Sequence, residues 1–275
     1  MKNIVSFCMP DNEKSCFACC PPIRPYGYEH IKYKNIIKRM LRENTLYFQP
    51  QKRPITGYSC WALGYVDKDF KQVGCLLHPA QNSSIDLRYL VDYGDKCHRE
   101  LCPEAKIFSQ LEYNTKKFWL RFADGLDSFS YSSRTINPLF KVFGLGKYVL
   151  EYIAKAEDWK DIEYAILKKD FPFLEFNIDL RIIAYPVKIM FKNGKTEISK
   201  QDIRQFLNIF NELINSQKYM EIPNTKYTHL LDMDKDFLNF LRLGFSLKKI
   251  NPEYARNLKQ KADEIILKMS KSFWF

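Results

Sequence analysis

The chain has 275 residues, of which 46% are hydrophobic and 27% are charged, and its net charge is +11. This composition is typical of a folded protein of about two domains and excludes a disordered or collagen-like chain. No run of 18 apolar residues occurs, so the sequence predicts no transmembrane helix. The first eight residues hold too short an apolar stretch for a secretory signal, so we expect a cytoplasmic protein without a membrane partner.

The first predicted element is a helix over residues 31–42, where apolar side chains recur at helical spacing. Its basic side chains are Lys32, Lys34, Lys38, Arg39 and Arg42. Two interpretations stay open: a surface helix with one solvated face, or a helix that binds a polyanion. No recognised nucleic-acid-binding motif supports the second, so we expect no nucleic-acid partner.

All eight cysteines lie in the first 102 residues, together with three of the four histidines. We therefore predict a cysteine-rich metal-binding domain over residues 1–111 and a mainly helical domain over residues 112–275. The predicted fold class is α+β, mainly α. It combines an irregular metal-binding part that carries a short β-hairpin with a helical part of unknown role.

The first cysteine motif is a CxxCC knot formed by Cys16, Cys19 and Cys20. A CxxC turn lets two thiolates converge on one metal. Neighbouring side chains of an extended segment point to opposite sides, so one of Cys19 and Cys20 can ligate while the other faces a second ligand group or the core. The proline-rich segment 21–28 predicts an ordered loop around the site. In that loop Arg24 is either a donor to cluster sulfurs or a surface arginine.

Residues 60–78 predict a β-hairpin with one cysteine on each arm, Cys60 and Cys75. His78 follows Cys75 at the spacing of a zinc ligand pair, and its alternative role is that of a turn histidine. The last pair is Cys97 and Cys102. The following proline suits the first turn of a helix over residues 103–120, which places Cys102 at the N-cap, where a helix stabilises a thiolate.

Three explanations compete for the clustered cysteines: disulfides, buried inert thiols, and a metal or iron–sulfur site. Disulfides are disfavoured because cytosolic thiols stay reduced, and eight clustered cysteines are more than an inert core requires. We favour the metal site, with a [4Fe–4S] cluster preferred to zinc because a compact set of cysteines with a distant one suits a cluster. The candidate ligands are Cys16, Cys19, Cys20, Cys60, Cys75, Cys97, Cys102 and, for zinc, His78.

The cysteine-free part shows helical periodicity and no catalytic signature. Predicted helices cover residues 137–156, 158–169, 199–216, 233–243 and 251–271. Asn193 and Gly194 predict a turn that closes a short hairpin. Asn251 is expected to cap the last helix, and the acidic residues 232–236 to begin the one before it. The sequence contains no GxGxxG, P-loop, HExxH or GxSxG motif, and its cysteine spacing excludes a CxxxCxxC radical enzyme.

The cysteine segments resemble the zinc- or iron-chelating cysteine-cluster family known by its CxxCxxCC motif. The residues that carry the resemblance are Cys16, Cys19 and Cys20 for the knot, residues 60–63 and 74–79 for the next two segments, and Cys97 and Cys102 for the final cysteines. Glu13 stands where the family has its first cysteine, and Cys8 is the candidate replacement. The resemblance implies a metal or iron–sulfur protein and supplies no reaction.

We therefore predict an iron–sulfur protein that serves electron transfer or cluster-based chemistry and works with a redox partner protein. Two alternatives remain, a zinc-stabilised interaction module and a protein that delivers metal. Whether the protein is an enzyme is left open; if it is one, an iron–sulfur-dependent oxidoreductase is expected.

Overall fold

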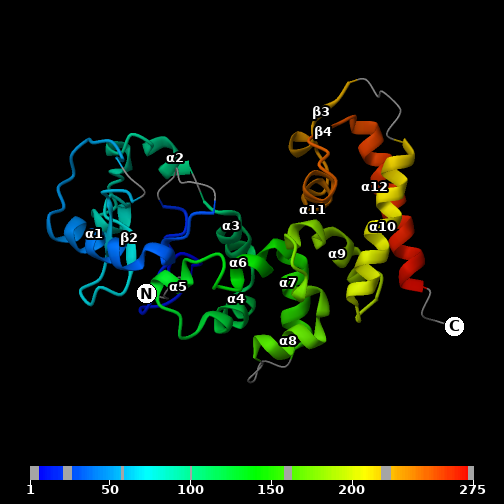
Figure 1. The fold of residues 1–275 in the computed structure, drawn as a ribbon, viewed down its shortest axis with the longest axis horizontal. Coiled ribbons are helices and arrows are strands. Elements are labelled where there is room, and N and C mark those ends of the chain that lie inside the picture. Colours follow the sequence, from blue (N-terminus) through cyan, green and yellow to red (C-terminus); the bar gives the residue numbers. More distant parts are fainter. Residues whose placement is uncertain are drawn as a thin grey trace. The chain divides into compact units, whose positions relative to one another are not determined.

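The computed structural model describes residues 6–20, 27–56, 59–99, 101–157, 163–217 and 224–271. The chain divides into two compact units, residues 1–140 and 141–275, whose elements are drawn in Figure 1. The described residues form mainly helices with two small antiparallel sheets, which confirms the predicted α+β, mainly α class. In these parts of the chain no helix is both long enough and apolar enough to cross a membrane.

In the first unit, small helices surround a short hairpin. Strands β1 (Leu63–Tyr65) and β2 (Val73–Cys75) pair antiparallel, with Leu63 opposite Cys75, which confirms the hairpin predicted over residues 60–78. The helices are α1 (Lys34–Leu46), α2 (Gly94–Arg99), α3 (Pro103–Gln110), α4 (Tyr113–Leu120), α5 (Ser128–Tyr131) and α6 (Leu139–Val142), the last of which runs into the second unit.

Helix α1 is the basic helix expected from the sequence. It packs against β1 through Ile37 and Leu41, which are fully buried, while Ile36 on the other side is 54% exposed. Lys34 forms an ion pair with Asp127 at 2.5 Å. One buried stripe and one solvated face are typical of an amphipathic surface helix. The buried stripe of α1 is part of the core of the first unit.

The helix predicted over residues 103–120 is interrupted. Leu111 and Glu112 adopt extended backbone angles, so α3 ends at Gln110 and α4 begins at Tyr113. Leu111 is buried, and the break turns the chain between the two helices. The domain division predicted at Leu111 thus falls inside the first compact unit, whose last residue is Phe140.

The second unit is helical around an aromatic core. Helices α10 and α12 run side by side (Figure 1), and Phe206, Phe210 and Phe240 pack among one another in the core with ring centroids 4.9–5.8 Å apart. Its helices are α7 (Gly146–Ala156), α8 (Tyr164–Asp170), α9 (Ala184–Lys192), α10 (Lys200–Gln217), α11 (Lys235–Asn239) and α12 (Pro252–Lys271). Strands β3 (Lys226–Tyr227) and β4 (Lys249–Ile250) form the second small sheet.

Several predicted boundaries in this unit need correction. The helix expected over 137–156 is divided before Gly146, whose φ of +77° breaks the helical run. The helix expected over 233–243 is the short α11 followed by a π-helical turn, Phe240–Gly244. The start of the helix expected over 158–169 falls on residues outside the described ones. The predicted caps are confirmed, because Asn251 accepts from the amide of Glu253 at 2.9 Å and Asp234 caps α11.

The hairpin predicted at Asn193 and Gly194 is wrong. The residues before this turn form helix α9, in which Val187, Met190 and Phe191 are all buried. Their spacing of three and four residues is helical, so burial against neighbouring helices decided a segment whose apolar run also suited a strand.

Candidate metal centre

The eight cysteines lie in the first unit as reduced thiols, and electrostatic interactions link them in two sets that are joined through Cys19 and Cys20. The first thiol group consists of Cys8, Cys16, Cys19 and Cys102. The second thiol group consists of Cys20, Cys60, Cys75 and Cys97.

Cys16 is at the centre of the first thiol group. Burial raises the pKa of its thiol well above the usual value, and the neighbouring thiols of Cys19, Cys8 and Cys102 raise it further. Burial also raises the pKa of Cys8 to about 11 and that of Cys102 to about 12, and thiols of the same group add to both shifts. The four side chains are therefore within electrostatic range of one another.

The scaffold of the first thiol group is a loop held against α3. The amide of Cys16 donates to the carbonyl of Cys8 at 2.8 Å, which closes the loop between them. The buried ring of Phe7 packs edge-on against Phe108 of α3, with ring centroids 5.8 Å apart. Since Cys102 caps α3, this aromatic contact brings the loop to the helix that carries the fourth thiol.

Cys102 occupies the N-cap of α3, as the sequence predicted. Its Sγ accepts a hydrogen bond from the amide of Ala105 at 3.3 Å, and Pro103 fills the first helical position. The partial positive charge of a helix N-terminus favours the thiolate over the neutral thiol.

The second thiol group is built on the open end of the hairpin. Burial raises the pKa of Cys60 to about 12, and the thiols of Cys75 and Cys97 raise it further. Burial raises the pKa of Cys75 to about 11, again with a contribution from Cys97. Cys97 comes from α2, and its carbonyl accepts a hydrogen bond from the guanidinium of Arg88 at 3.1 Å. The hairpin thus supplies two thiols and α2 a third.

The two groups meet at Cys19 and Cys20. A tight turn, closed by the amide of Cys20 donating to the carbonyl of Phe17 at 3.0 Å, separates their directions. A hydrogen bond with the Cys19 thiol has the largest effect in raising the pKa of Cys20, followed by burial and then by Cys75 and Cys60. Cys19 also acts on all three other thiols of the first group, so it interacts with both groups.

Backbone amides donate to half of the thiols. The donor lies two or three residues beyond each acceptor: Ala18 for Cys16, Ala62 for Cys60, Leu77 for Cys75 and Ala105 for Cys102. Such N–H···S bonds favour the thiolate, because they stabilise negative charge on sulfur. These four amides therefore offset part of the effect of burial, which raises the pKa of the same thiols.

Each thiol group has an arginine beside it. Arg134 pairs with the buried carboxylate of Glu104 at 2.7 Å and lies within electrostatic range of Cys102 and Cys16. In the second group, Arg88 lies within electrostatic range of Cys75 and Cys97, and it is held by Asp86 through an ion pair of 2.7 Å. A positive charge next to buried thiolates offsets part of the cost of burying them.

Ser15 joins the loop of the first group to the hairpin of the second. Its Oγ donates to the carbonyl of Val73 at 2.7 Å and accepts from the amide of Val73 at 2.6 Å. The amide of Ser15 donates to Oγ of Ser128, which itself donates to the carbonyl of Lys71. These buried bonds fix the two thiol groups relative to each other.

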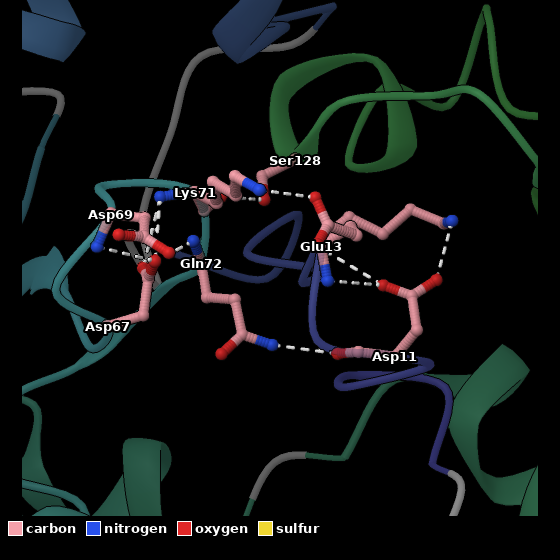
Figure 2. Close-up of polar contacts among 8 residues, drawn as sticks. Asp11, Glu13, Asp67, Asp69, Lys71, Gln72 and Ser128 are labelled. Carbon is pink, nitrogen blue, oxygen red and sulfur yellow. Dashed lines mark hydrogen bonds and ion pairs between the residues drawn. The ribbon is translucent and has the colours of Figure 1, made fainter.

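A second tie lies at the tip of the hairpin, where polar side chains meet the N-terminal segment (Figure 2). Lys71 pairs with Glu13 at 2.6 Å, and the side-chain amide of Gln72 donates to the carbonyl of Asp11 at 2.7 Å. Asp67 closes the hairpin turn by accepting from the amides of Lys71 and Gln72. The acidic side chains here serve the turn and the ion pair, so they are accounted for by the fold.

Of the histidines singled out by the sequence, His78 has a structural role. Its Nδ1 accepts from the amide of Ala80 at 3.2 Å and caps the 3₁₀ turn Pro79–Gln81. A neutral ring whose Nδ1 accepts carries its proton on Nε2, which leaves neither nitrogen ready to ligate. The arrangement thus does not favour His78 as a zinc ligand. The side chain of His98 and the whole of Arg24 lie outside the described residues.

Sequence reasoning missed several residues of this site. His30 is buried, packs on Phe17 with ring centroids 4.7 Å apart, and its Nε2 contacts the carbonyl of Cys20. Arg134 and Ser15 are also new. The role of each of these residues depends on a contact with a residue 10 to 117 positions away in the chain, and no local motif predicts such a contact. The same reason kept the place of Cys8 undecided.

Within the ranges described, no three His, Cys, Asp or Glu side chains stand close enough to share one metal ion. No family model, curated protein or solved structure matches the chain. The resemblance to the cysteine-cluster family thus stays a prediction from the motif residues.

Proposed function

We propose that the protein is an iron–sulfur protein, in which thiolates of the first unit bind a [4Fe–4S] cluster that transfers electrons. The observation that carries the proposal is the gathering of cysteines in fours, with backbone N–H···S bonds already made to Cys16, Cys60, Cys75 and Cys102. Four thiolates are the ligand set of a [4Fe–4S] cluster. Binding would replace the protons that burial keeps on these thiols at neutral pH.

A zinc ion and a four-iron cluster require different spacings of their four thiolates. Zinc binds thiolates at about 2.3 Å in a tetrahedron, so its four sulfurs must crowd together within about 4 Å of one another. In a four-iron cluster each thiolate binds a separate iron, so the sulfurs stand further apart. In the sequence a compact set, Cys16, Cys19 and Cys20, is joined by distant cysteines such as Cys102, and this pattern suits the cluster.

The exposure of the thiols supports a role in electron transfer. Cys19 is exposed, whereas Cys60 is buried and the other thiols lie between these extremes. When bound, a cluster accepts and donates single electrons, and its rate of exchange depends on how closely another redox centre approaches. The first thiol group reaches the surface through Cys19, so a redox partner protein would dock on that side.

Anaerobic purification followed by visible spectroscopy tests the proposal. We expect a brown protein with broad visible absorbance that bleaches when dithionite is added and returns on oxidation. The matched control is the same preparation after chelation of its metal, which should be colourless. A colourless protein that contains stoichiometric zinc would overturn the proposal and indicate a zinc-stabilised module.

A further inference from the structure

We propose that the solvent-facing side of α1 is a docking surface for an acidic protein, which it binds through cations grouped around an exposed isoleucine. We call this surface the basic face, and it consists of Lys32, Ile36, Lys38, Arg39 and Arg42, all of which are exposed. Lys32 belongs to the 3₁₀ turn His30–Tyr33 that leads into the helix. The inference names the kind of partner, and it rests on the proposed function only for the partner's redox role.

The positive charge of the basic face is largely uncompensated. Arg39 forms an ion pair with Glu43, but its N···O distance is 3.9 Å and the two side chains are 74% and 60% exposed. Over the described ranges of the chain, no carboxylate lies within ion-pair distance of Lys32, Lys38 or Arg42. Cations four positions apart on a helix, such as Lys38 and Arg42, repel each other, so this arrangement does not stabilise the fold. Carboxylates of a bound partner would remove this repulsion.

Aromatic rings hold two of the cations in place. Nζ of Lys38 lies 5.9 Å from the ring centroid of Phe129, and the guanidinium carbon of Arg42 lies 5.8 Å from that of Phe70. Phe70 stands in the hairpin turn with φ at +55°, a conformation that is costly for a bulky residue, and its ring packs edge-on against Tyr65. A cation that is already held over a ring loses less freedom when it binds a carboxylate.

The apolar side chain in the basic face favours a protein over a nucleic acid as the partner. Ile36 is 54% exposed, and Lys32 and Arg39 lie four positions before it and three after it, on the same side of the helix. Tyr33, three positions before Ile36, is 47% exposed. Protein interfaces combine an apolar centre with a polar rim, whereas the phosphates of a nucleic acid offer an isoleucine no contact partner.

The helix that carries the basic face also contacts the segments that carry the thiols. On its inner side, the side-chain amide of Asn44 donates to the carbonyl of Cys60 at 3.2 Å. Phe129, which lies under Lys38, packs edge-on against Phe17 of the cysteine knot, with ring centroids 5.2 Å apart. A helix with its side chains is about 10–12 Å across, so a partner on the basic face would be separated from Cys60 by one helix.

Fluorescence anisotropy on the full-length protein tests the docking surface. The probe is a labelled synthetic peptide in which glutamates and leucines recur at helical spacing, and a labelled duplex DNA is the nucleic-acid probe. At low salt, Lys38→Gln combined with Arg42→Gln should raise the dissociation constant of the peptide about three- to tenfold, because two exposed ion pairs are lost. Lys106→Gln combined with Lys117→Gln is the matched control, since it removes the same charge from exposed lysines of α3 and α4, and it should change this constant less than about twofold.

Ile36→Ser separates a protein partner from a nucleic acid. It should weaken binding of the peptide about threefold and leave binding of the DNA unchanged. If the double variant fails to fold, Arg39→Gln replaces it, with an expected rise of about two- to threefold in the dissociation constant of the peptide. Three results would each overturn the proposal: a wild type that does not bind the peptide, equal losses in the test and control variants, and DNA that binds more tightly than the peptide while Ile36→Ser changes neither.

Oxidation of the dithionite-reduced protein by ferricyanide tests the redox role of the partner. Each ferricyanide ion accepts one electron from the reduced protein and becomes ferrocyanide, and this trianion should be attracted to the basic face. At low salt the double variant should react severalfold more slowly than the wild type with ferricyanide, and no more slowly with the trication hexaammineruthenium(III). Equal rates with ferricyanide would overturn the redox role of the basic face. A protein that dithionite cannot reduce would overturn the proposed function, while the peptide measurements, which need no metal, would still decide the docking surface.

Discussion

The Ser15→Ala variant tests whether the loop of the first thiol group is held to the hairpin as described. Val73 lies opposite Tyr65 at a position where the hairpin strands do not hydrogen-bond each other, because the flanking bonds join Val66 to Gln72 and Leu76 to Ala62. The amide and carbonyl of Val73 therefore point away from β1, and Ser15 Oγ satisfies both.

The size of the effect follows from these two bonds. Ser15 and Val73 are each 1% exposed, so water reaches neither backbone group when the hydroxyl is removed. A buried polar group left without a partner costs about 1–3 kcal/mol. We expect the free energy of unfolding of the first unit to fall by about 2–4 kcal/mol, while the bond from the Ser15 amide to Ser128 remains.

Urea denaturation of the metal-free chain, followed by tryptophan fluorescence, measures this loss. Ser109→Ala is the matched control, since it removes an exposed hydroxyl and should change the free energy of unfolding by less than about 0.5 kcal/mol. A Ser15→Ala protein as stable as the control would refute the reasoning, because the two groups of Val73 would then have found other partners at no cost.

Three further predictions concern both units. Lys188→Met should destabilise the second unit by about 2 kcal/mol at pH 7, because it removes ion pairs of 2.7 Å to Asp234 and Asp236. Against the effect of burial, the hydrogen bond from Lys188 lowers the pKa of Asp234. This stability is therefore present above about pH 4 and is lost as the pH falls through the lowered pKa, so the difference between the urea midpoints of the two proteins should shrink as the pH falls below about 4. Gly146→Ala should cost about 1–3 kcal/mol by the same measurement, since φ is +77° and a Cβ would lie 3.2 Å from Asp236, and an unchanged midpoint would contradict this geometry. Removal of metal by a chelator should speed hydrogen exchange in residues 1–140 and leave residues 141–275 unchanged, and mass spectrometry of peptides would reveal a uniform change if the second unit also depended on metal.

Local patterns in the sequence were sufficient for part of the fold. A proline after Cys102 predicted a capped helix, and the polar turn 67–69 between two cysteine-bearing arms predicted the hairpin that carries Cys75. Both depend on neighbours in the chain. The run before Asn193 had an apolar pattern that suited either a strand or a helix, and its burial among other helices decided for α9.

For a related reason, the sequence alone did not predict which cysteines interact with one another. Cys19 and Cys20 are adjacent, and only the turn that begins at Phe17 sends them to different groups. Cys8 joins Cys102 because Phe7 packs on α3, roughly a hundred positions further along the chain. Spacing motifs report which residues can ligate, whereas long-range packing decides which of them meet.

The acid-labile sulfide content of anaerobically purified protein tests the central claim most directly, because inorganic sulfide belongs to iron–sulfur clusters and to neither a zinc site nor a set of inert thiols. We expect about four sulfides per chain for each [4Fe–4S] cluster held, matched by an equal number of irons. Protein that folds, contains zinc or no metal, and releases no sulfide would contradict the account.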